Sequence, residues 1–493
     1  MSSAAPDVSS EELSVTFQPP LALQRRSWVF SIMRRENVTS VLDIGCGEGA
    51  LISCLCNPAP WLPPPPPHIL PSPDTHDHAI PTPRDIDGVA STEGILRPKV
   101  IRALDISPKD LQDAIEETTP KVADPASGSA IQPSPRWEDL EVKIWQGSLE
   151  DYNPEFVDTE CIVSTEVIEH LPEDILPKFA PMLLGAYHPR LLLITTPSYT
   201  FNARFTAPDS YKENRDGYSD PTGRTDRIFR HHDHKFEWTV EEFTEWCEAV
   251  AEKWGYEVEV GGVGTAVEKD PWGRDAQLGF ASQVAAFKRK EGGRYQELRE
   301  TECARMGILT DTPTLHTLVA TQKHTSHPQT GKPARPEAIN DTVKNLIKHW
   351  NDNPVSLRDI WFENEVNILC GGWVEVLVGA IRGNNELKLR RSSTDAMWEV
   401  YLNGFVPTAN EDSGGVVFDL NDEEEVHWEE EEETSWEESF DDRIIAGDKY
   451  QADIAWGGVS GSDTSGWTDV CDALEKHQGV VTDDGWGWLP RKE

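Results

Sequence analysis

The chain has 493 residues, with 45 Lys or Arg and 86 Asp or Glu, so its formal net charge at pH 7 is −41. This length allows two or three domains, and an evenly spread charge of this sign would exclude a nucleic-acid partner. The charge is not even, because residues 401–493 hold 25 Asp or Glu and 5 Lys or Arg, whereas basic clusters occur at 24–26, 33–35 and 224–235. No run is long and apolar enough to span a membrane, and no signal peptide is recognisable. The eight cysteines lack the spacing of a zinc knuckle. We therefore expect a reducing compartment, the cytoplasm or the nucleus.

The predicted elements begin after a small, polar stretch at 1–13, which we expect to be disordered. From 14 to 290, short β-branched runs alternate with longer amphipathic stretches, which is typical of an α/β domain with a parallel sheet. Seven strands are predicted, at 40–44, 100–106, 142–147, 161–165, 191–195, 256–260 and 281–287. A capping box that begins at Thr239 predicts a helix as far as Trp254, which Gly255 ends.

Three segments depart from this alternation. Prolines recur through 57–97, so this stretch is predicted to be a disordered surface insertion, and the simplest interpretation gives it no role. Residues 291–400 are expected to form a helical C-terminal extension, either a separate subdomain or a part packed on the first domain. The acidic, low-complexity tail at 401–493 is predicted to be disordered.

A glycine-rich run follows the first predicted strand and contains Asp43, Gly45 and Gly47. Such a turn lets backbone N–H groups approach a ligand at a helix N-terminus. The run resembles the first motif of class I S-adenosylmethionine (AdoMet) methyltransferases, and it lacks the glycine spacing of the alternative, a dinucleotide-binding oxidoreductase. The resemblance implies that Asp105, at the end of the second strand, binds the ribose of the cofactor. It also implies that Ser148, after the third strand, lies near the adenine.

Glu166, Glu169 and His170 follow the fourth predicted strand at positions i, i+3 and i+4, which share one face of a helical turn. Two carboxylates and an imidazole are credible ligands of a divalent cation. The carboxyl end of a strand is also where ligands bind in open α/β sheets. A solvated helix face is the usual interpretation of an isolated pattern of this kind. The position after a strand and the histidine cluster at 231–234 favour a metal site instead.

Further motifs occur in a fixed order around these two. Together with them, the stretches at 17–25, 196–202, 233–239 and 279–283 resemble the small-RNA 3′-terminal 2′-O-methyltransferases, the Hua-enhancer family, over about 14–290. The resemblance implies a class I methyltransferase (Rossmann-like) fold, a mixed seven-stranded sheet with helices on both faces. It implies AdoMet and Mg²⁺, or Mn²⁺ or Co²⁺, as cofactors. The implied catalytic metal ligands are Glu166, Glu169, His170 and His234.

The same resemblance implies transfer of a methyl group from AdoMet to the 2′-hydroxyl of the last nucleotide of small RNAs, which protects them in RNA silencing. A divalent cation would lower the pKa of that hydroxyl, and only a terminal ribose offers two adjacent hydroxyls to one ion. Arg25, Arg230 and Lys235 are candidates for phosphate contacts, and His231 has no assigned role. The alternatives are a small-molecule O-methyltransferase and an inactive adaptor that binds small RNA.

Tryptophans next to glycines recur in the acidic tail, and such pairs resemble segments that dock into Argonaute proteins. A chance occurrence in a Trp-rich chain is the simpler interpretation. The residues concerned are Trp456, Trp467, Trp486 and Trp488.

Overall fold

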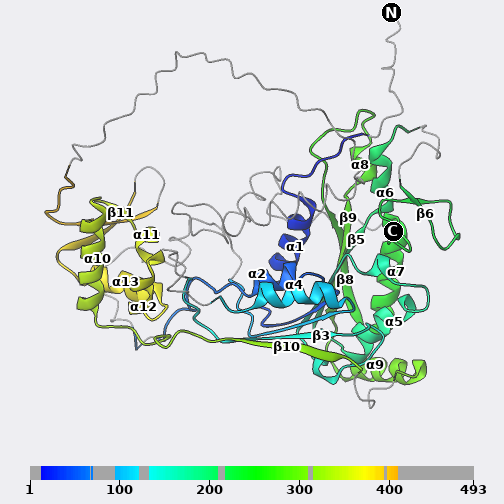
Figure 1. Cartoon of the computed structure of the whole chain (residues 1–493), viewed down its shortest axis with the longest axis horizontal. Helices are drawn as coiled ribbons and strands as arrows, with labels where there is room; N and C mark the ends of the chain where they lie inside the picture. Colours follow the sequence, from blue (N-terminus) through cyan, green and yellow to red (C-terminus); the bar gives the residue numbers. More distant parts are fainter. Residues whose placement is uncertain are drawn as a thin grey trace, which may run out of the picture. The chain divides into compact units, whose positions relative to one another are not determined.

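The computed structural model describes residues 13–66, 68–69, 95–121, 133–208, 217–308, 315–392 and 397–408 (Figure 1). The described residues fall into two compact units. The first ends at Thr330, and the second begins at Gly331 and also takes up the short stretch that starts at Pro63. The predicted disordered stretch at 1–13 lies outside the described residues except for Leu13, whose N–H donates to the carbonyl of Phe205 at 2.8 Å. Within the described part, no helix is both long and apolar enough to cross a bilayer.

One eight-stranded sheet forms the centre of the first unit, in the order β10-β3-β2-β1-β4-β5-β9-β8. Strands β1 to β5 pair in parallel, whereas β9 runs antiparallel to both β5 and β8. All seven predicted strands are present, and their order is that of the class I methyltransferase fold. The strands are β1 (Ser40–Ile44), β2 (Val100–Asp105), β3 (Leu140–Gln146), β4 (Cys161–Thr165), β5 (Leu191–Pro197), β8 (Tyr256–Val263), β9 (Ser282–Arg289) and β10 (Thr317–His324).

The eighth strand, β10, was not predicted, and it lies beyond the expected domain boundary at residue 290. It pairs antiparallel with β3 at the edge of the sheet. Most of its side chains are exposed, so its sequence lacks the apolar alternation that marks a half-buried strand. The first unit therefore extends 40 residues past that boundary, to Thr330.

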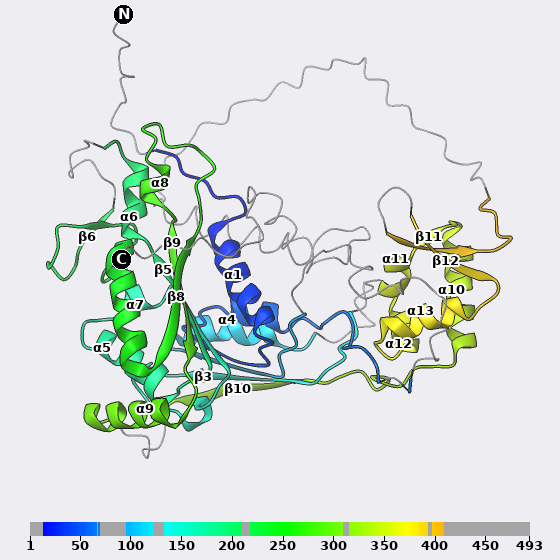
Figure 2. The same cartoon turned by 180° about the vertical axis from the view of Figure 1, so that it is seen from behind.

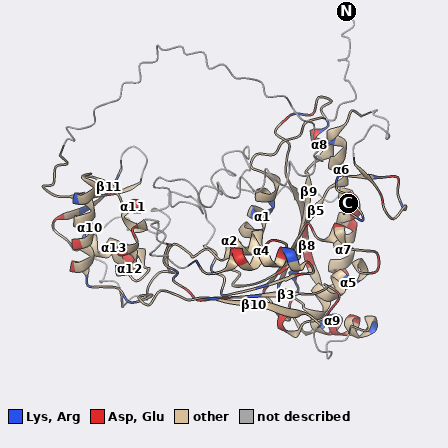
Figure 3. Ribbon diagram, viewed as in Figure 1, with Lys and Arg blue, Asp and Glu red and all other residues tan. Residues whose placement is uncertain are grey.

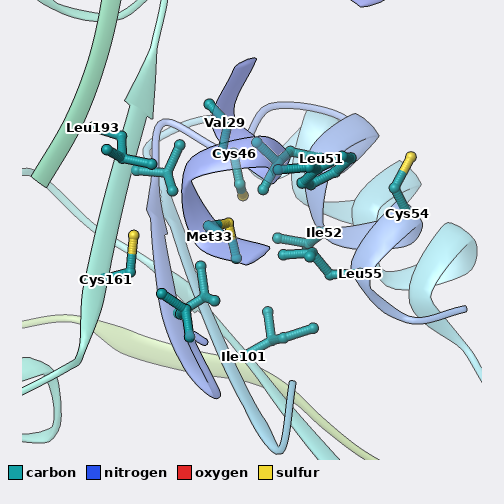
Figure 4. Packing of buried hydrophobic residues seen from close by; sticks show 14 of the residues in the cluster. Val29, Met33, Cys46, Leu51, Ile52, Cys54, Leu55, Ile101, Cys161 and Leu193 are labelled. Carbon is teal, nitrogen blue, oxygen red and sulfur yellow. The ribbon is translucent and has the colours of Figure 1, made fainter. Parts of the chain in front are cut away.

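Helices cover both faces of the sheet, as predicted (Figures 1 and 2). On one face lie α1 (Leu21–Arg35), α2 (Ala50–Leu55) and α4 (Pro108–Thr118). Figure 4 shows Val29 and Met33 of α1 among the buried side chains of this face. The opposite face carries α5 (Leu176–Ala180), the π-helical turn η3 (Pro181–Ala186) and α7 (Val240–Trp254). Shorter elements are η1 (Pro154–Phe156), η2 (Ile168–His170), α6 (Tyr199–Asn202), η4 (Ala203–Phe205), β6 (Tyr218–Ser219), β7 (Ile228–Phe229) and α8 (Asp275–Leu278), and α9 (Gly293–Met306) follows the core strands.

The predicted helix after Thr239 is confirmed at both ends. The Thr239 side chain accepts from the backbone of Glu242, and the Glu242 carboxylate accepts from the Thr239 N–H, which completes the capping box. Gly255 adopts φ of +69° after Trp254, a conformation that favours glycine and ends the helix.

The predicted disorder of the proline-rich stretch at 57–97 is wrong at its two ends, where the structure describes residues 57–66 and 95–97. Trp61 and Leu62 are buried. Arg97 donates to the Trp61 carbonyl at 2.6 Å and pairs with Glu138. Proline content alone predicted disorder here, but a tryptophan and a leucine within the run bury apolar surface. Residues 70–94 lie outside the described ranges.

The second unit was expected to be helical, but it also contains a three-stranded antiparallel sheet in the order β11-β13-β12. Ile339, Val343 and Ile347 form the buried stripe of its first helix. The unit runs in the order of one helix, a strand, three helices and a β-hairpin, and β13 crosses the boundary predicted at residue 400. The elements are α10 (Pro336–Trp350), β11 (Val355–Ser356), α11 (Leu357–Phe362), α12 (Asn364–Leu369), α13 (Val374–Arg382), β12 (Leu387–Arg391) and β13 (Trp398–Leu402).

Candidate active site

The predicted cofactor loop lies between β1 and α2, at the carboxyl end of the central strand. Gly45 and Gly47 adopt φ of +74° and +50°, where a side chain is disfavoured. The N–H groups of Gly45 and Cys46 donate to the carbonyl of Leu104 at 2.8 and 3.2 Å, so the loop is fixed to the end of β2. The sequence prediction of a tight turn at this position is confirmed.

Asp105 joins the two predicted cofactor elements. Its Oδ2 accepts from the N–H of Gly47 at 2.8 Å, and its Oδ1 accepts from the N–H of Ser107 at 2.9 Å. The N–H of Gly147 donates to the Asp105 carbonyl at 3.0 Å, so Ser148 follows directly beside it. The five predicted cofactor residues therefore lie at the ends of three adjacent parallel strands.

Asp43 is the buried acid of this group and is 2% exposed. Burial, followed by the nearby charge of Asp105, raises the pKa of Asp43 to about 7. Its Oδ1 has no hydrogen-bond partner among the described residues. A buried carboxyl with an unsatisfied oxygen fits a ligand that brings donors or positive charge, and AdoMet carries both.

Glu166 follows β4 in a strained backbone conformation, with φ of +55°. A residue other than glycine in this region costs about 1–3 kcal/mol, and such strain gathers at functional sites. Its Oε1 accepts from the Thr195 hydroxyl at 2.8 Å, and its Oε2 lies 3.1 Å from Nη1 of Arg25. Arg25, predicted as a phosphate contact, is thus placed against this carboxylate.

Glu169 lies in the short turn η2 and is fully buried. One carboxylate oxygen, Oε2, accepts from the Thr196 hydroxyl at 2.9 Å, whereas Oε1 has no partner among the described residues. Burial, together with the charge of Glu166, raises the pKa of Glu169 well above its ordinary value. An unpaired oxygen on a buried acid again fits a cation that is to be bound there.

Three imidazoles meet beside this turn. His170, His231 and His234 each contribute one ring nitrogen to this cluster, and these three nitrogens all lie within 4.8 Å of one another. The N–H of Lys235 donates to the Glu169 carbonyl at 2.8 Å, which holds the histidine loop against η2. Burial, followed by the neighbouring His234 and His231, lowers the pKa of His170 to about 4, so its ring is neutral and able to bind a metal ion.

The structure therefore brings two of the four predicted ligands, His170 and His234, into one cluster of possible ligands. It adds His231, to which the sequence analysis gave no role. Glu166 and Glu169 are not part of this cluster: Thr195 and Arg25 hold the two oxygens of Glu166, and Thr196 holds one oxygen of Glu169. The sequence did contain a signal for His231 as a possible ligand, because it lies three residues before the predicted ligand His234.

Glu237 is a second residue without an assigned role in the sequence analysis. It is 1% exposed, and its Oε1 lies 2.6 Å from Nδ1 of His234. A proton on Nδ1 shared with this carboxylate leaves Nε2 of His234 free to act as a ligand, an arrangement common behind metal-binding histidines. Glu237 also accepts from Asn202 and from the N–H of Arg230, so its orientation is fixed.

The cofactor loop and the acidic turn touch each other through Gly45. A Cβ atom at Gly45 would overlap the side chain of Val167, which lies between Glu166 and Ile168. This close approach packs the two predicted sites against each other, and it explains why position 45 takes glycine.

No family model matches the chain. Curated proteins do match it: the small RNA 2′-O-methyltransferase of Arabidopsis thaliana is 29% identical over 276 residues, 56% of this chain and 23% of that protein. Those of Gallus gallus and Drosophila melanogaster are each 28% identical, over 58% and 57% of this chain and 57% of their own lengths. The chain is a relative of the small RNA 2′-O-methyltransferases. The resemblance drawn from the motifs is thereby confirmed.

The relationship covers only part of these methyltransferases, since the chain spans little more than half the length of the animal relatives and under a quarter of the plant one. Among solved structures, a small RNA methyltransferase aligns with 64% of this chain and 28% of its own, at 24% identity and a TM-score of 0.39. A bacterial methyltransferase domain aligns with 55% of this chain and 100% of its own, at 23% identity and a TM-score of 0.34.

Proposed function

We propose that this chain transfers a methyl group from AdoMet to the 2′-hydroxyl of the 3′-terminal nucleotide of small RNAs. The observation that carries the proposal is the contact between Gly45 and Val167, which packs the predicted cofactor loop against the turn with the predicted ligands Glu166, Glu169 and His170. The named activity of the relatives supports the same reaction.

AdoMet would be held by Asp43, Gly45, Gly47, Asp105 and Ser148. When bound, it supplies an electrophilic methyl group on a positively charged sulfur. In this proposal Asp43 faces the amino-acid end of the cofactor, where a positive group lets the buried carboxyl ionise. Asp105, already fixed by two backbone N–H groups, presents its carboxylate to the ribose hydroxyls.

A divalent cation, Mg²⁺ or the more nitrogen-tolerant Mn²⁺ or Co²⁺, would be held by Glu166, Glu169, His170 and His234, with His231 as an additional candidate. When bound, it supplies a positive charge that lowers the pKa of a sugar hydroxyl. The Glu237 carboxylate would hold the proton on Nδ1 of His234 and so keep Nε2 directed at the site.

The test is methyl transfer from labelled AdoMet to a short RNA whose 3′ end is either intact or oxidised with periodate, with the metal varied. The proposal predicts label on the intact RNA, none on the oxidised RNA, and loss of label with a chelator. Equal labelling of both RNAs would favour a different acceptor, such as the small molecule of the first alternative. Binding of RNA without any turnover would favour the adaptor.

We further propose that the tail tryptophans Trp456, Trp467, Trp486 and Trp488 dock into an Argonaute protein, which would place the enzyme with small RNAs in the cytoplasm or nucleus. These residues lie outside the described ranges, so the proposal rests on their Trp–Gly pairs. Capture of a purified Argonaute by the full chain, and its loss when all four are changed to alanine, would support it. Unchanged capture by that variant would refute it.

A further inference from the structure

The unpredicted strand β10 begins directly after a buried histidine, His316, which is 6% exposed. Thr317, the first residue of β10, pairs with Gln146, the last residue of β3. Antiparallel pairing thus carries His316 to the carboxyl end of β3. The loop with Gly147 and Ser148, predicted to lie at the adenine of AdoMet, begins at this point.

The His316 ring is held by one hydrogen bond at each nitrogen. Nε2 lies 2.8 Å from the carbonyl oxygen of Ser148, and because a carbonyl can only accept, Nε2 carries the hydrogen. Nδ1 is then an acceptor, and the side-chain amide of Asn153 donates to it at 3.3 Å. The ring also packs on Phe156, at 5.5 Å between centroids. Burial lowers the pKa of His316, which agrees with a neutral ring.

The partners of His316 belong to a loop that also has hydrogen bonds of its own, since the Ser148 carbonyl accepts from the N–H of Asp151 at 3.1 Å as well. Asn153 is fully buried, and its Oδ1 accepts from the N–H of Glu155 at 3.0 Å. Its N–H donates to the Tyr187 hydroxyl at 3.1 Å. A Cβ atom at Gly147 would overlap the His316 ring, so the imidazole occupies the space that a side chain at 147 would need. The ring therefore packs against Gly147 and connects Ser148, at the start of the loop, with Asn153, near its end.

We infer that His316 is a positioning residue for AdoMet: from its place directly before β10 it holds the Gly147–Ser148 turn in the conformation that receives the adenine. The inference rests on the proposed function, since Ser148 is a cofactor residue only if AdoMet binds there. It gives the eighth strand a role, because the segment after residue 290 then completes the cofactor site rather than following it.

The experiment compares full-length His316→Ala with His324→Ala. His324 is a matched control because it is similarly buried, at 8% exposed, but lies at the opposite end of β10, where it pairs with Leu140. His316→Gln keeps a donor that can reach the Ser148 carbonyl. For each variant, calorimetry gives the Kd for AdoMet, steady-state kinetics give kcat and the KM for AdoMet and for RNA, and thermal melting gives Tm.

For His316→Ala we expect the Kd and KM for AdoMet to rise about tenfold, with little change in the KM for RNA, as for loss of about one buried hydrogen bond. His316→Gln should recover most of this loss. His324→Ala should lower Tm without changing the Kd. An unchanged Kd in a folded His316→Ala, or an equal rise in His324→Ala, would overturn the inference.

If His316→Ala does not fold, Asn153→Ala removes the partner of Nδ1 and leaves the histidine in place. It should weaken AdoMet binding by a smaller factor, and an unchanged Kd in this variant would equally overturn the inference. A wild-type chain that binds AdoMet but does not methylate RNA would contradict the proposed function and leave this comparison intact. A wild-type chain that does not bind AdoMet would contradict both.

Discussion

Glu166 combines a strained backbone with a carboxylate that is held from two sides. Its φ of +55° is one of only five positive values at non-glycine positions among the described residues. Thr195 and Arg25 each hold one of its oxygens. Backbone strain at one acid whose two carboxylate oxygens are both held indicates that the position of this side chain matters more than local stability.

Replacing Glu166 by alanine should therefore lower the rate of methyl transfer about 100-fold or more. Loss of a metal ligand lowers activity more than loss of a residue that only hydrogen-bonds to a ligand. The Kd for AdoMet should change little, since no predicted cofactor residue contacts this carboxylate. Glu173→Ala, which removes an exposed acid from the following loop, is the control. Full activity in Glu166→Ala would refute the metal assignment.

Asp43 should make the stability of the ligand-free protein depend on pH. Its pKa is about 7 in the folded chain and near its ordinary value of 3.8 when unfolded. Between these values the folded state keeps a proton that the unfolded state has lost, so the free energy of unfolding falls as pH rises, by up to about 1.4 kcal/mol per pH unit. Urea denaturation across this window should show a flatter dependence for Asp43→Asn. If the free energy of unfolding depended on pH equally in the wild type and in Asp43→Asn, the raised pKa of Asp43 would be contradicted.

At the scale of elements, the contact between the loop after β1 and the turn after β4 can be tested with two glycines. Gly45 and Gly47 both have positive φ, but a Cβ atom at Gly47 meets nothing within 4 Å, whereas one at Gly45 overlaps Val167. Gly47→Ala should cost about 1 kcal/mol of folding free energy from the backbone alone.

Gly45→Ala should cost more stability than Gly47→Ala and should also lower kcat, because it displaces the turn that carries Glu166 and Glu169. The additional change Val167→Ala makes room for the new methyl group and should restore part of the activity. Chemical denaturation and single-turnover kinetics measure the two effects. Equal behaviour of the two single variants would show that the contact does not couple the sites.

The elements with strong local signals were predictable from the sequence. The seven core strands, the capping box at Thr239 and the glycine turn after β1 all follow from short-range patterns, and the structure contains them. Strand β10 was missed because its exposed side chains carry no apolar period. Trp61 shows the opposite error, since a proline-rich composition concealed a residue that packs in the core.

The candidate site was predictable only in part: two of the four predicted ligands, His170 and His234, meet in the structure, whereas Glu166 and Glu169 lie outside their cluster. The motif order brought His170 and His234 together correctly, whereas the approach of His231 depends on how the loop before α7 folds back on η2. The contact of Glu237 with His234 and that of His316 with Ser148 depend on tertiary geometry. The His316 contact in particular joins residues 168 positions apart, a distance at which no local pattern acts.

At the scale of the whole molecule, the acidic excess is unevenly distributed: residues 401–493 carry a net charge of −20, and the other 400 residues carry −21. The described part of the second unit has nine Lys or Arg and nine Asp or Glu, and α10 carries both signs (Figure 3). The net charge of −41 therefore describes the chain as a whole and does not represent each unit. Residues 1–330 have a net charge of −20, so an RNA substrate would have to meet local basic clusters, such as those at 24–26, 33–35 and 224–235.

The two units predict where the chain can be shortened. A chain that ends at residue 330 retains β10 and every predicted site residue, so it should fold and bind AdoMet with a Kd within about threefold of the full chain. A chain that ends at residue 308 lacks β10 and should bind at least about tenfold more weakly. Calorimetry with AdoMet compares them. Equal affinity of the two shortened chains would place the functional boundary near 290 after all.

The central claim is that the methyl group goes to the last 2′-hydroxyl of an RNA. Two synthetic RNAs of identical sequence, one ending in a ribonucleotide and one in a 2′-deoxyribonucleotide, test it most directly with labelled AdoMet and a divalent cation. We predict label in the first RNA, released by nuclease digestion as a 2′-O-methylated terminal nucleoside, and none in the second. Equal label in both RNAs, or label at an internal position, would contradict the account.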